Sequence, residues 1–215
     1  MWCVAELNDE YIERMENILD LYEKPYDSEE PMICIDEKSV QLLEDIYKPI
    51  PAKPGKIKKV DAEYKRRGTA NIFAAIEPKF GRHFTYVTEN RKSKEFAKVL
   101  SRIAITYQDA RTIHLVCDNL NTHNLKSLID FYDVENGTKI WDRFTVHYTP
   151  KHGSWLNQAE IELSIVSNQC FGKNRIPDID TLRAKVNRWN REVNKKRVTI
   201  NWRFTTDNAK ETFKY

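Results

Sequence analysis

The chain has 215 residues, of which 31% are charged and 40% hydrophobic, so it is long enough for one α/β domain with a substantial core. It holds no apolar run near the roughly 18 residues that a membrane span needs, and its first residues lack the basic and apolar regions of a signal peptide. We therefore expect a cytoplasmic protein without membrane contact. Its four cysteines form no CxxC pair, so we expect reduced thiols and no zinc site. They are Cys3, Cys34, Cys117 and Cys170.

The net charge of +3 is unevenly distributed along the chain. Residues 1–50 hold 4 Lys or Arg and 14 Asp or Glu, a balance of −10, so the remainder carries +13. Residues 51–67 alone hold seven basic side chains against Asp61 and Glu63. This asymmetry is typical of a face that binds a polyanion, although a solvated lysine-rich loop has the same composition.

The first predicted elements are a helix and a buried strand. Apolar side chains at helical spacing predict an amphipathic helix over residues 8–23. An apolar, β-branched run then predicts a strand from Pro31 to Asp36, which ends at a carboxylate. We expect Glu37, directly after it, to face solvent, with a supporting acid beside Asp36 as the alternative.

The next stretch begins with an irregular segment and continues into a hairpin. Residues 47–67 carry three prolines and a glycine, which predicts a long loop or an exposed hairpin. Strands are predicted over 71–76 and 82–88, joined by turn residues. Ser93 is a suitable cap for a helix that runs to Tyr107.

The second half alternates strands and helices. A strand over 112–117 ends at Asp118, and turn and capping residues lead into a helix over 122–131. A fifth strand is predicted over 144–148. Three helices are then predicted, beginning near Ser154, Asp178 and Thr205. This order predicts an α/β fold with a mixed sheet.

Asp118 follows a buried strand and precedes a helix, where open α/β sheets place their sites. Taken alone, it has the simpler interpretation of a turn or capping residue. Two strand-end aspartates and a helical glutamate, however, are the parts of a carboxylate cage for hard divalent cations. The sequence offers Asp36, Asp118 and either Glu160 or Glu162 for it.

Five stretches together resemble the catalytic domain of DDE transposases, in the bacterial insertion-sequence branch of the mariner-like superfamily. They are Cys34-Ile-Asp36-Glu37-Lys38, Gly68-Thr-Ala-Asn71-Ile-Phe, Asp118-Asn119-Leu-Asn-Thr-His123, Lys151-His-Gly-Ser-Trp-Leu-Asn157-Gln-Ala-Glu160 and Asn201-Trp-Arg-Phe-Thr. The resemblance covers nearly the whole chain, and the stretches keep the family's order.

The resemblance implies a ribonuclease H-like fold, a mixed five-stranded sheet flanked by helices, with the first and fourth strands as neighbours. Residues 31–215 would form the catalytic domain and residues 1–30 an N-terminal helical extension. Family members carry helix-turn-helix domains upstream, and we expect these to be absent here, either because the chain is a fragment or because the recognition domain is encoded separately. The implied partners are DNA, at transposon ends and target, and a second copy in a homodimer that joins two ends.

The implied chemistry is cleavage of DNA at element ends and transfer of the 3′-hydroxyl to target DNA, with Mg²⁺ as cofactor and Mn²⁺ as a substitute. We expect Asp36 to be shared between two ions, with Asp118 and Glu160 each holding one. On a helical wheel Glu160 lies about 100° from the buried stripe's centre at Ala159 and Glu162 about 60° to the other side. The wheel allows either glutamate, and the resemblance favours Glu160.

Further residues are expected to contact substrate. The resemblance assigns Asn119 and His123 to orienting substrate or water, with a capping network as the alternative. Lys151 and His152 precede the third-acid helix, where a phosphate would meet a helix N-terminus, with a solvated loop as the alternative. Asn157, from the same motif, and the basic residues Lys65, Arg66 and Arg67 complete the expected DNA-binding set.

Two rival functions remain open from the sequence. A structure-specific nuclease or resolvase on the same fold would share the three acids and lack strand transfer. A DNA-binding remnant of a transposase would fold without activity, although intact acids at all three positions argue against inactivation.

Overall fold

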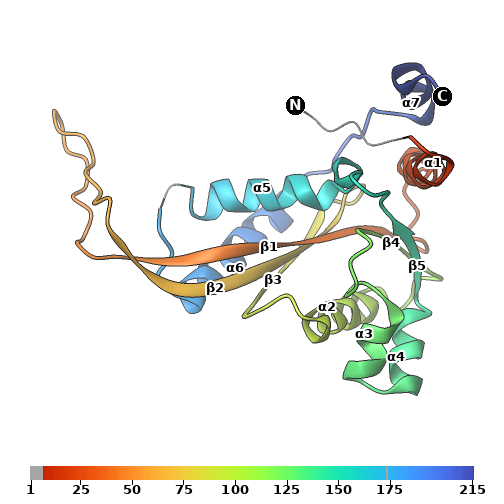
Figure 1. The fold of residues 1–215 in the computed structure, drawn as a ribbon, viewed down its shortest axis with the longest axis horizontal. Helices are drawn as coiled ribbons and strands as arrows, with labels where there is room; N and C mark the ends of the chain where they lie inside the picture. The colour runs from red at the N-terminus through yellow and green to blue at the C-terminus, as the bar shows by residue number, and fades with distance from the viewer. Residues whose placement is uncertain (1–6, 173) are drawn as a thin grey trace.

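The computed structural model describes residues 7–172 and 174–215 and contains a five-stranded mixed sheet in the order β3-β2-β1-β4-β5 (Figure 1). The strands are β1 (Met32–Asp45), β2 (Tyr64–Glu77), β3 (Arg82–Thr88), β4 (Ile113–Cys117) and β5 (Phe144–Tyr148). β1, β2 and β3 are antiparallel neighbours, whereas β4 runs parallel to β1 and β5 parallel to β4. This arrangement confirms the predicted ribonuclease H-like sheet, including the adjacency of the first and fourth strands.

Helices cover both faces of the sheet (Figure 1). They are α1 (Asp9–Glu23), α2 (Ser93–Thr106), α3 (Leu125–Phe131), α4 (Val134–Trp141), α5 (Gln158–Cys170), α6 (Ile179–Lys196) and α7 (Thr206–Phe213). α2, α3 and α4 lie against one face, and α5 and α6 lie against the other. None of the helices in the described part of the chain is long and apolar enough to cross a membrane.

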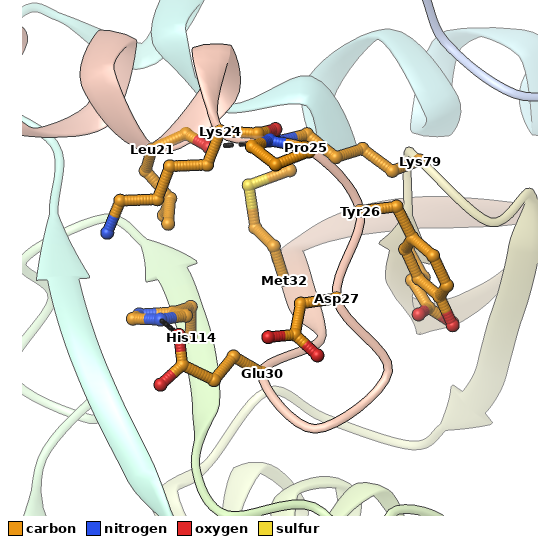
Figure 2. A pocket seen from close by; sticks show the side chains of 10 residues that line it. Leu21, Lys24, Pro25, Tyr26, Asp27, Glu30, Met32, Lys79 and His114 are labelled. Carbon is orange, nitrogen blue, oxygen red and sulfur yellow. Dashed lines mark hydrogen bonds and ion pairs between the residues drawn. The ribbon is translucent and has the colours of Figure 1, made fainter.

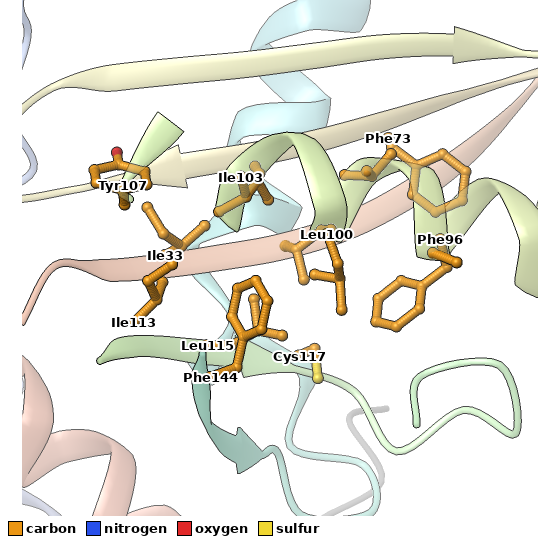
Figure 3. Close-up of a cluster of buried hydrophobic side chains, with 14 of the residues drawn as sticks. Ile33, Phe73, Phe96, Leu100, Ile103, Tyr107, Ile113, Leu115, Cys117 and Phe144 are labelled. Carbon is orange, nitrogen blue, oxygen red and sulfur yellow. The ribbon is translucent and has the colours of Figure 1, made fainter. Parts of the chain in front are cut away.

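One core cluster fills the face covered by α2 (Figure 3). Successive side chains of a strand point to opposite faces, so Ile33 and Ile35 of β1 meet Phe96 and Leu100 of α2 on this side. Each of these four side chains is at most 1% exposed. The same alternation puts the side chain of Glu37 on this face and that of Asp36 on the other.

The opposite face carries α1 as well as α5. Met15 and Ile18 of α1 pack with Cys34 and Val116, in a cluster that also includes Ala159 of α5. The acidic first helix is therefore part of the same core as the central strands. Cys34, Cys117 and Cys170 are free thiols, and Cys3 lies outside the described residues.

The segment between the end of β1 and the start of β2, residues 46–63, forms an arm that extends away from the helices (Figure 1). The predicted strands 31–36 and 71–76 are too short, because the ladder between β1 and β2 extends as far as the pair Asp45 and Tyr64. Two isolated bridges then pair residues within the arm. Residues 64–69 of β2 are exposed, so no buried face marks them as strand, whereas β1 buries Val40 and Leu42 between exposed neighbours. Arg175 fixes the base of the arm: its Nη1 donates to Asp45 Oδ1 (2.7 Å) and its Nη2 to the carbonyl oxygen of Asp61 (2.8 Å).

Three helix predictions need correction. α3 begins at Leu125 and not at 122, because the side chain of Asn124 caps it by accepting from Ser127 N. α4 was not expected. The helix predicted from Ser154 divides into a short 3₁₀ turn, Ser154–Leu156, and α5, with Asn157 as the cap between them.

Candidate carboxylate site

β1 and β4 bring two of the predicted acids to the same edge of the sheet. The strands pair in parallel, with Cys34 opposite Val116. Asp36 and Asp118 each lie two residues further along, so the same register sets them side by side at the carboxyl end of β4. Asp36 projects on the side where α5 begins, whereas Asp118, one residue past β4, has its Oδ1 2.6 Å from Nδ1 of His123.

The electrostatics of Asp36 place a third acid within reach. Burial raises the pKa of Asp36, the N–H of Glu37 donates to its carboxylate (2.8 Å) and lowers it, and the charges of Glu37, Asp118 and Glu160 raise it further, to about 7. Carboxylates that repel one another favour a bound cation or proton. The three predicted acids therefore form one electrostatic group.

The two glutamates of α5 have different surroundings. Glu160 lies in the first turn of α5 and is exposed, and Ser154 Oγ donates to its Oε1 (3.3 Å). Glu162 is only 4% exposed and lies against β3, where its Oε1 is 2.6 Å from Nδ1 of His83. Glu162 is therefore already paired inside the core, and Glu160 is the α5 acid near Asp36.

His123 is buried and lies between two acids. Its Nδ1 is 2.6 Å from Asp118 Oδ1, and its Nε2 is 3.3 Å from Glu37 Oε2. Neither close contact is aligned as a hydrogen bond, and both carboxylate oxygens are buried without a hydrogen-bond partner. Burial opposes the positive charge of His123, but Asp118 and Glu37 outweigh it and raise its pKa to about 9. The ring also stacks on Phe96, with 4.4 Å between centroids.

Glu37 differs from its predicted role. Its side chain is 2% exposed, so the expectation of a solvent-facing strand end is wrong. Arg91 Nη1 lies 3.8 Å from its Oε1. The period-two alternation after Ile33 and Ile35 could have indicated this, because it puts Glu37 on the α2 face. The alternative interpretation, an acid beside the site, agrees with its position.

Asn157 connects the start of α5 to the strand that carries Asp36. Its Oδ1 accepts from Ala159 N (3.1 Å) and caps the helix, and its Nδ2 donates to the carbonyl oxygen of Ile35 (2.8 Å). At 2% exposure it is part of the structural frame. Its two bonds hold Glu160 and Asp36 on elements fixed to each other.

The other predicted substrate contacts are exposed. Asn119, directly after Asp118, and the pair Lys151 and His152, in the turn before α5, lie at the surface around the acids. The basic residues 65–67 lie at the base of the arm instead. Lys65 pairs across the ladder with Glu44, eight residues beyond Asp36 on β1 and so roughly 27 Å away.

The donor set fits a hard divalent cation, but the acids have not converged on one point. Across residues 7–172 and 174–215, no group of three or more His, Cys, Asp or Glu is arranged to hold a metal ion. Asp118 Oδ1 is nevertheless a buried oxygen without a hydrogen-bond partner, and Asp36 is held among like charges. Such oxygens are the ligands that Mg²⁺ and Mn²⁺ prefer.

A cavity of about 250 Å³ lies at the other end of the sheet, beside the first residues of β1 and β4 (Figure 2). It includes none of the predicted site residues. His114 and Glu30 point toward each other there, with 3.7 Å between Nε2 and Oε2. The cavity is therefore separate from the carboxylate edge.

Comparisons with known proteins agree with the geometry. A family model described as DDE superfamily endonuclease matches residues 31–183. No curated protein matches the sequence. Among solved structures, the Mos1 mariner paired end complex with Mn has a TM-score of 0.56 at 15% identity, covering 91% of this chain and 62% of that one. The Mos1 transposase paired-end complex with left transposon end has a TM-score of 0.59 at 14% identity, covering 92% and 61%.

The Mos1 Strand Transfer Complex is similar to the same degree, with a TM-score of 0.57 at 15% identity and coverage of 91% and 61%. At this identity the likeness shows the fold. The chain spans about three fifths of the length of the solved chains that it matches.

Proposed function

Because the chain belongs to the family of DDE superfamily endonucleases, we propose that it is the catalytic domain of a transposase. It would cleave phosphodiester bonds at insertion-sequence ends and transfer the freed 3′-hydroxyl to target DNA. The observation that supports this most is the placing of Asp36 and Asp118 on adjacent parallel strands, with Glu160 close enough to raise the pKa of Asp36.

We assign the three acids to metal binding. Asp36 would be shared between two sites, and Asp118 and Glu160 would each complete one of them. Mg²⁺, with Mn²⁺ as a substitute, would supply charge stabilisation and an activated hydroxyl when bound. Support comes from the buried oxygen of Asp118 without a hydrogen-bond partner and from the repulsion around Asp36.

Two other residues would position the acids. His123 has its Nδ1 2.6 Å from Asp118 Oδ1 and a pKa raised to about 9, so it would hold that carboxylate in place beside β1. Asn157 would hold the start of α5 against β1 through its bond to Ile35. Asn119, Lys151 and His152 are exposed around the acids, where DNA phosphates would meet them.

We further propose the partners and the extent of the domain. Residues 31–215 would be the catalytic domain and residues 1–30 its N-terminal extension, with end recognition by a separate helix-turn-helix domain. Synapsis of two DNA ends would need a homodimer. Work on DNA would place the protein in the cytoplasm, associated with the nucleoid. Related solved structures are named as paired-end and strand-transfer complexes of Mos1, which supports a DNA substrate.

The test is metal-dependent cutting of plasmid and of terminal-repeat DNA with Mg²⁺, Mn²⁺ or chelator. We expect cutting with either metal and loss of at least about 100-fold in Asp118→Ala and in Glu160→Ala. Glu135→Ala, which removes an exposed acid on α4, is the matched control and should cut normally.

Each remaining outcome has a defined meaning. Cutting that survives Glu160→Ala contradicts the assignment of the third acid. Cutting without joining of the 3′-end to target DNA identifies a nuclease or resolvase on the same fold. Salt-sensitive DNA binding with no cutting under any metal identifies an inactive remnant.

A further inference from the structure

β3 is an edge strand, and part of its outer edge is already paired by a side chain. The sheet order places β2 on one side of β3 and no strand on the other. At His83 the outward N–H donates to Asn194 Oδ1 (2.9 Å), and Asn194 Nδ2 donates to the His83 carbonyl oxygen (2.8 Å). One amide of α6 thus makes the pair of bonds that a neighbouring strand would make.

The edge is open beyond His83. Thr85 and Val87 lie two and four residues on, so their N–H and C=O groups point outward in the same direction. In the described part of the chain, no hydrogen bond reaches these outward groups. The hydroxyl of Thr85, a residue only 8% exposed, is also buried without a partner. Unpaired edges of this kind are templates for another strand.

A groove runs along this open edge. Its volume is about 470 Å³, and its walls come from α2 on one side and α6 on the other. The lining residues are Thr85, Tyr86, Val87, Thr88, Glu95, Lys98, Val99, Arg102, Arg183 and Asn187. A strand that entered it would lie between two helices.

The walls of the groove carry a net positive charge. Lys98, Arg102 and Arg183 line it against the single acid Glu95. Arg102 is exposed, and its guanidinium lies 5.0 Å from the centre of the Tyr86 ring. Across residues 7–172 and 174–215, no carboxylate forms an ion pair with Arg102. Arg183 of α6 is paired with Asp180 (2.7 Å) and Lys98 of α2 with Glu95 (3.2 Å), so Arg102 is the groove cation that most favours a carboxylate on an incoming chain.

We propose that this groove binds an extended acidic peptide of a partner protein, which adds to β3 as a sixth strand. A peptide supplies both the acceptors for the N–H groups and the donors for the C=O groups of Thr85 and Val87. A DNA phosphate could accept from the N–H groups but has no donor for the carbonyls. The β3 edge of a second copy would bring the same positive charge, so like charges would oppose that pairing.

The test uses a blocked, fluorescein-labelled hexapeptide of alternating glutamate and threonine, and the full 215-residue chain. We expect saturable binding by fluorescence anisotropy. A peptide with proline at both central positions lacks one N–H on each of its two edges, and a peptide with glutamine for glutamate lacks the charge. Both should bind at least about tenfold more weakly.

Two variants of the chain separate backbone pairing from charge. Val87→Pro removes one outward N–H and leaves the ladder to β2 intact, since proline is tolerated on an edge strand. Arg102→Glu reverses a charge in the groove. Each should weaken binding at least about tenfold. Lys139→Glu, the same charge change at an exposed site on α4, should leave binding unchanged.

Hydrogen exchange of the unsubstituted chain shows which amides the peptide contacts, so this measurement does not depend on the folding of a variant. Saturating peptide should slow exchange of the Thr85 and Val87 amides at least about tenfold. Unchanged exchange at these amides, or equal binding of the proline peptide, would overturn strand addition. Binding of duplex DNA that is lost in Arg102→Glu and retained in Val87→Pro would assign the groove to DNA. A dimer lost in Val87→Pro would assign it to a second copy.

Discussion

At the scale of single residues, Glu160 and Glu162 lie on the same helix but in different surroundings, one beside the strand-end aspartates and the other in the core. Glu160 lies at the exposed first turn of α5 beside the strand-end aspartates. Glu162 is buried, and its Oε1 lies 2.6 Å from Nδ1 of His83. Activity and stability should therefore depend on different glutamates.

This division gives a prediction for stability. Glu162→Ala should lower the free energy of unfolding by about 2 kcal/mol, because it leaves the buried imidazole of His83 without its hydrogen-bond partner. Glu160→Ala should change it by less than about 0.5 kcal/mol, since an exposed side chain is lost. Urea unfolding followed by circular dichroism measures both. Equal destabilisation by the two substitutions would contradict the assignment.

The limits of sequence reasoning are also visible at this scale. Asp36 and Asp118 could be chosen because each ends an apolar run, a signal carried by the sequence itself. The burial of Glu37 depends on Arg91 and His123, which come from other parts of the chain. The local alternation of β1 gives the face on which Glu37 lies, but the partners that bury it there are set by tertiary packing.

At the scale of elements, the start of α5 depends on Asn157. Asn157→Ala should cost about 2 kcal/mol, because it removes a helix cap and leaves the buried carbonyl of Ile35 without a donor. Asp178→Ala removes only an exposed cap, on α6, and should cost about 1 kcal/mol. Chemical unfolding of both variants tests the difference. Equal losses would mean that the bond to Ile35 adds nothing.

The arm offers a prediction about DNA affinity. Arg67 Nε already donates to Glu44 Oε2 (2.7 Å), whereas Lys65 and Arg66 have no ion-pair partner within the described residues. Lys65→Ala and Arg66→Ala should each reduce the slope of log affinity against log salt by about one, and Arg67→Ala by less. Anisotropy titrations with duplex DNA between 50 and 200 mM salt would measure the slopes. An equal change for Arg67→Ala would show that its pair with Glu44 opens on DNA.

Elements with one buried face were predictable and the exposed ones were not. β3 and β5 match the predicted strands 82–88 and 144–148, because their apolar residues mark them. The outer half of β2 carries exposed side chains, and its pairing rests on backbone bonds that leave no hydrophobic pattern, whereas the outer half of β1 buries Val40 and Leu42. The short helix α4 was missed for a related reason: only Gly137 of it is buried.

At the scale of the whole molecule, pH should act through a histidine far from the acids. His147 on β5 lies between His114, whose Nδ1 is 2.9 Å from its Nε2, and Asn17 of α1. Burial, the charge of His114 and that of Lys24 lower the pKa of His147 to about 4, and Glu30 faces the outer nitrogen of His114. His147 therefore becomes protonated at a lower pH in the folded state than in the unfolded chain.

The sign of the pH effect follows from proton binding. Between pH 6.5 and about 4 the unfolded chain holds a proton on His147 and the folded chain does not, so stability falls as pH falls through this window. We expect the loss to be on the order of 2 kcal/mol. His147→Gln should flatten the unfolding free energy across the same window. If the unfolding free energy of His147→Gln fell with pH as steeply as that of the unsubstituted chain, His147 would not be the source of the pH dependence.

The sheet topology could be predicted, because the order of strands and helices along the chain indicated a mixed sheet and the resemblance implied which strands are neighbours. The parallel register between β1 and β4, which sets Asp36 beside Asp118, then follows from the fold. The groove beside β3 could not be predicted, because it depends on the distance between α2 and α6, and the sequence carries no signal for that spacing.

The continuity of β1 has a mechanical consequence. Asp36 lies four residues after the start of this strand, and the strand runs on for nine more residues into the arm, roughly 30 Å, without a hinge loop. Along that distance Val40 and Leu42 pack with side chains of α5 and α6, and Leu43 N donates to the carbonyl oxygen of Ile176 (2.7 Å). The register shift between Gln41 and Leu43 falls within this packed stretch. A force on the tip of the arm would therefore be shared with the two helices before it reached the acid.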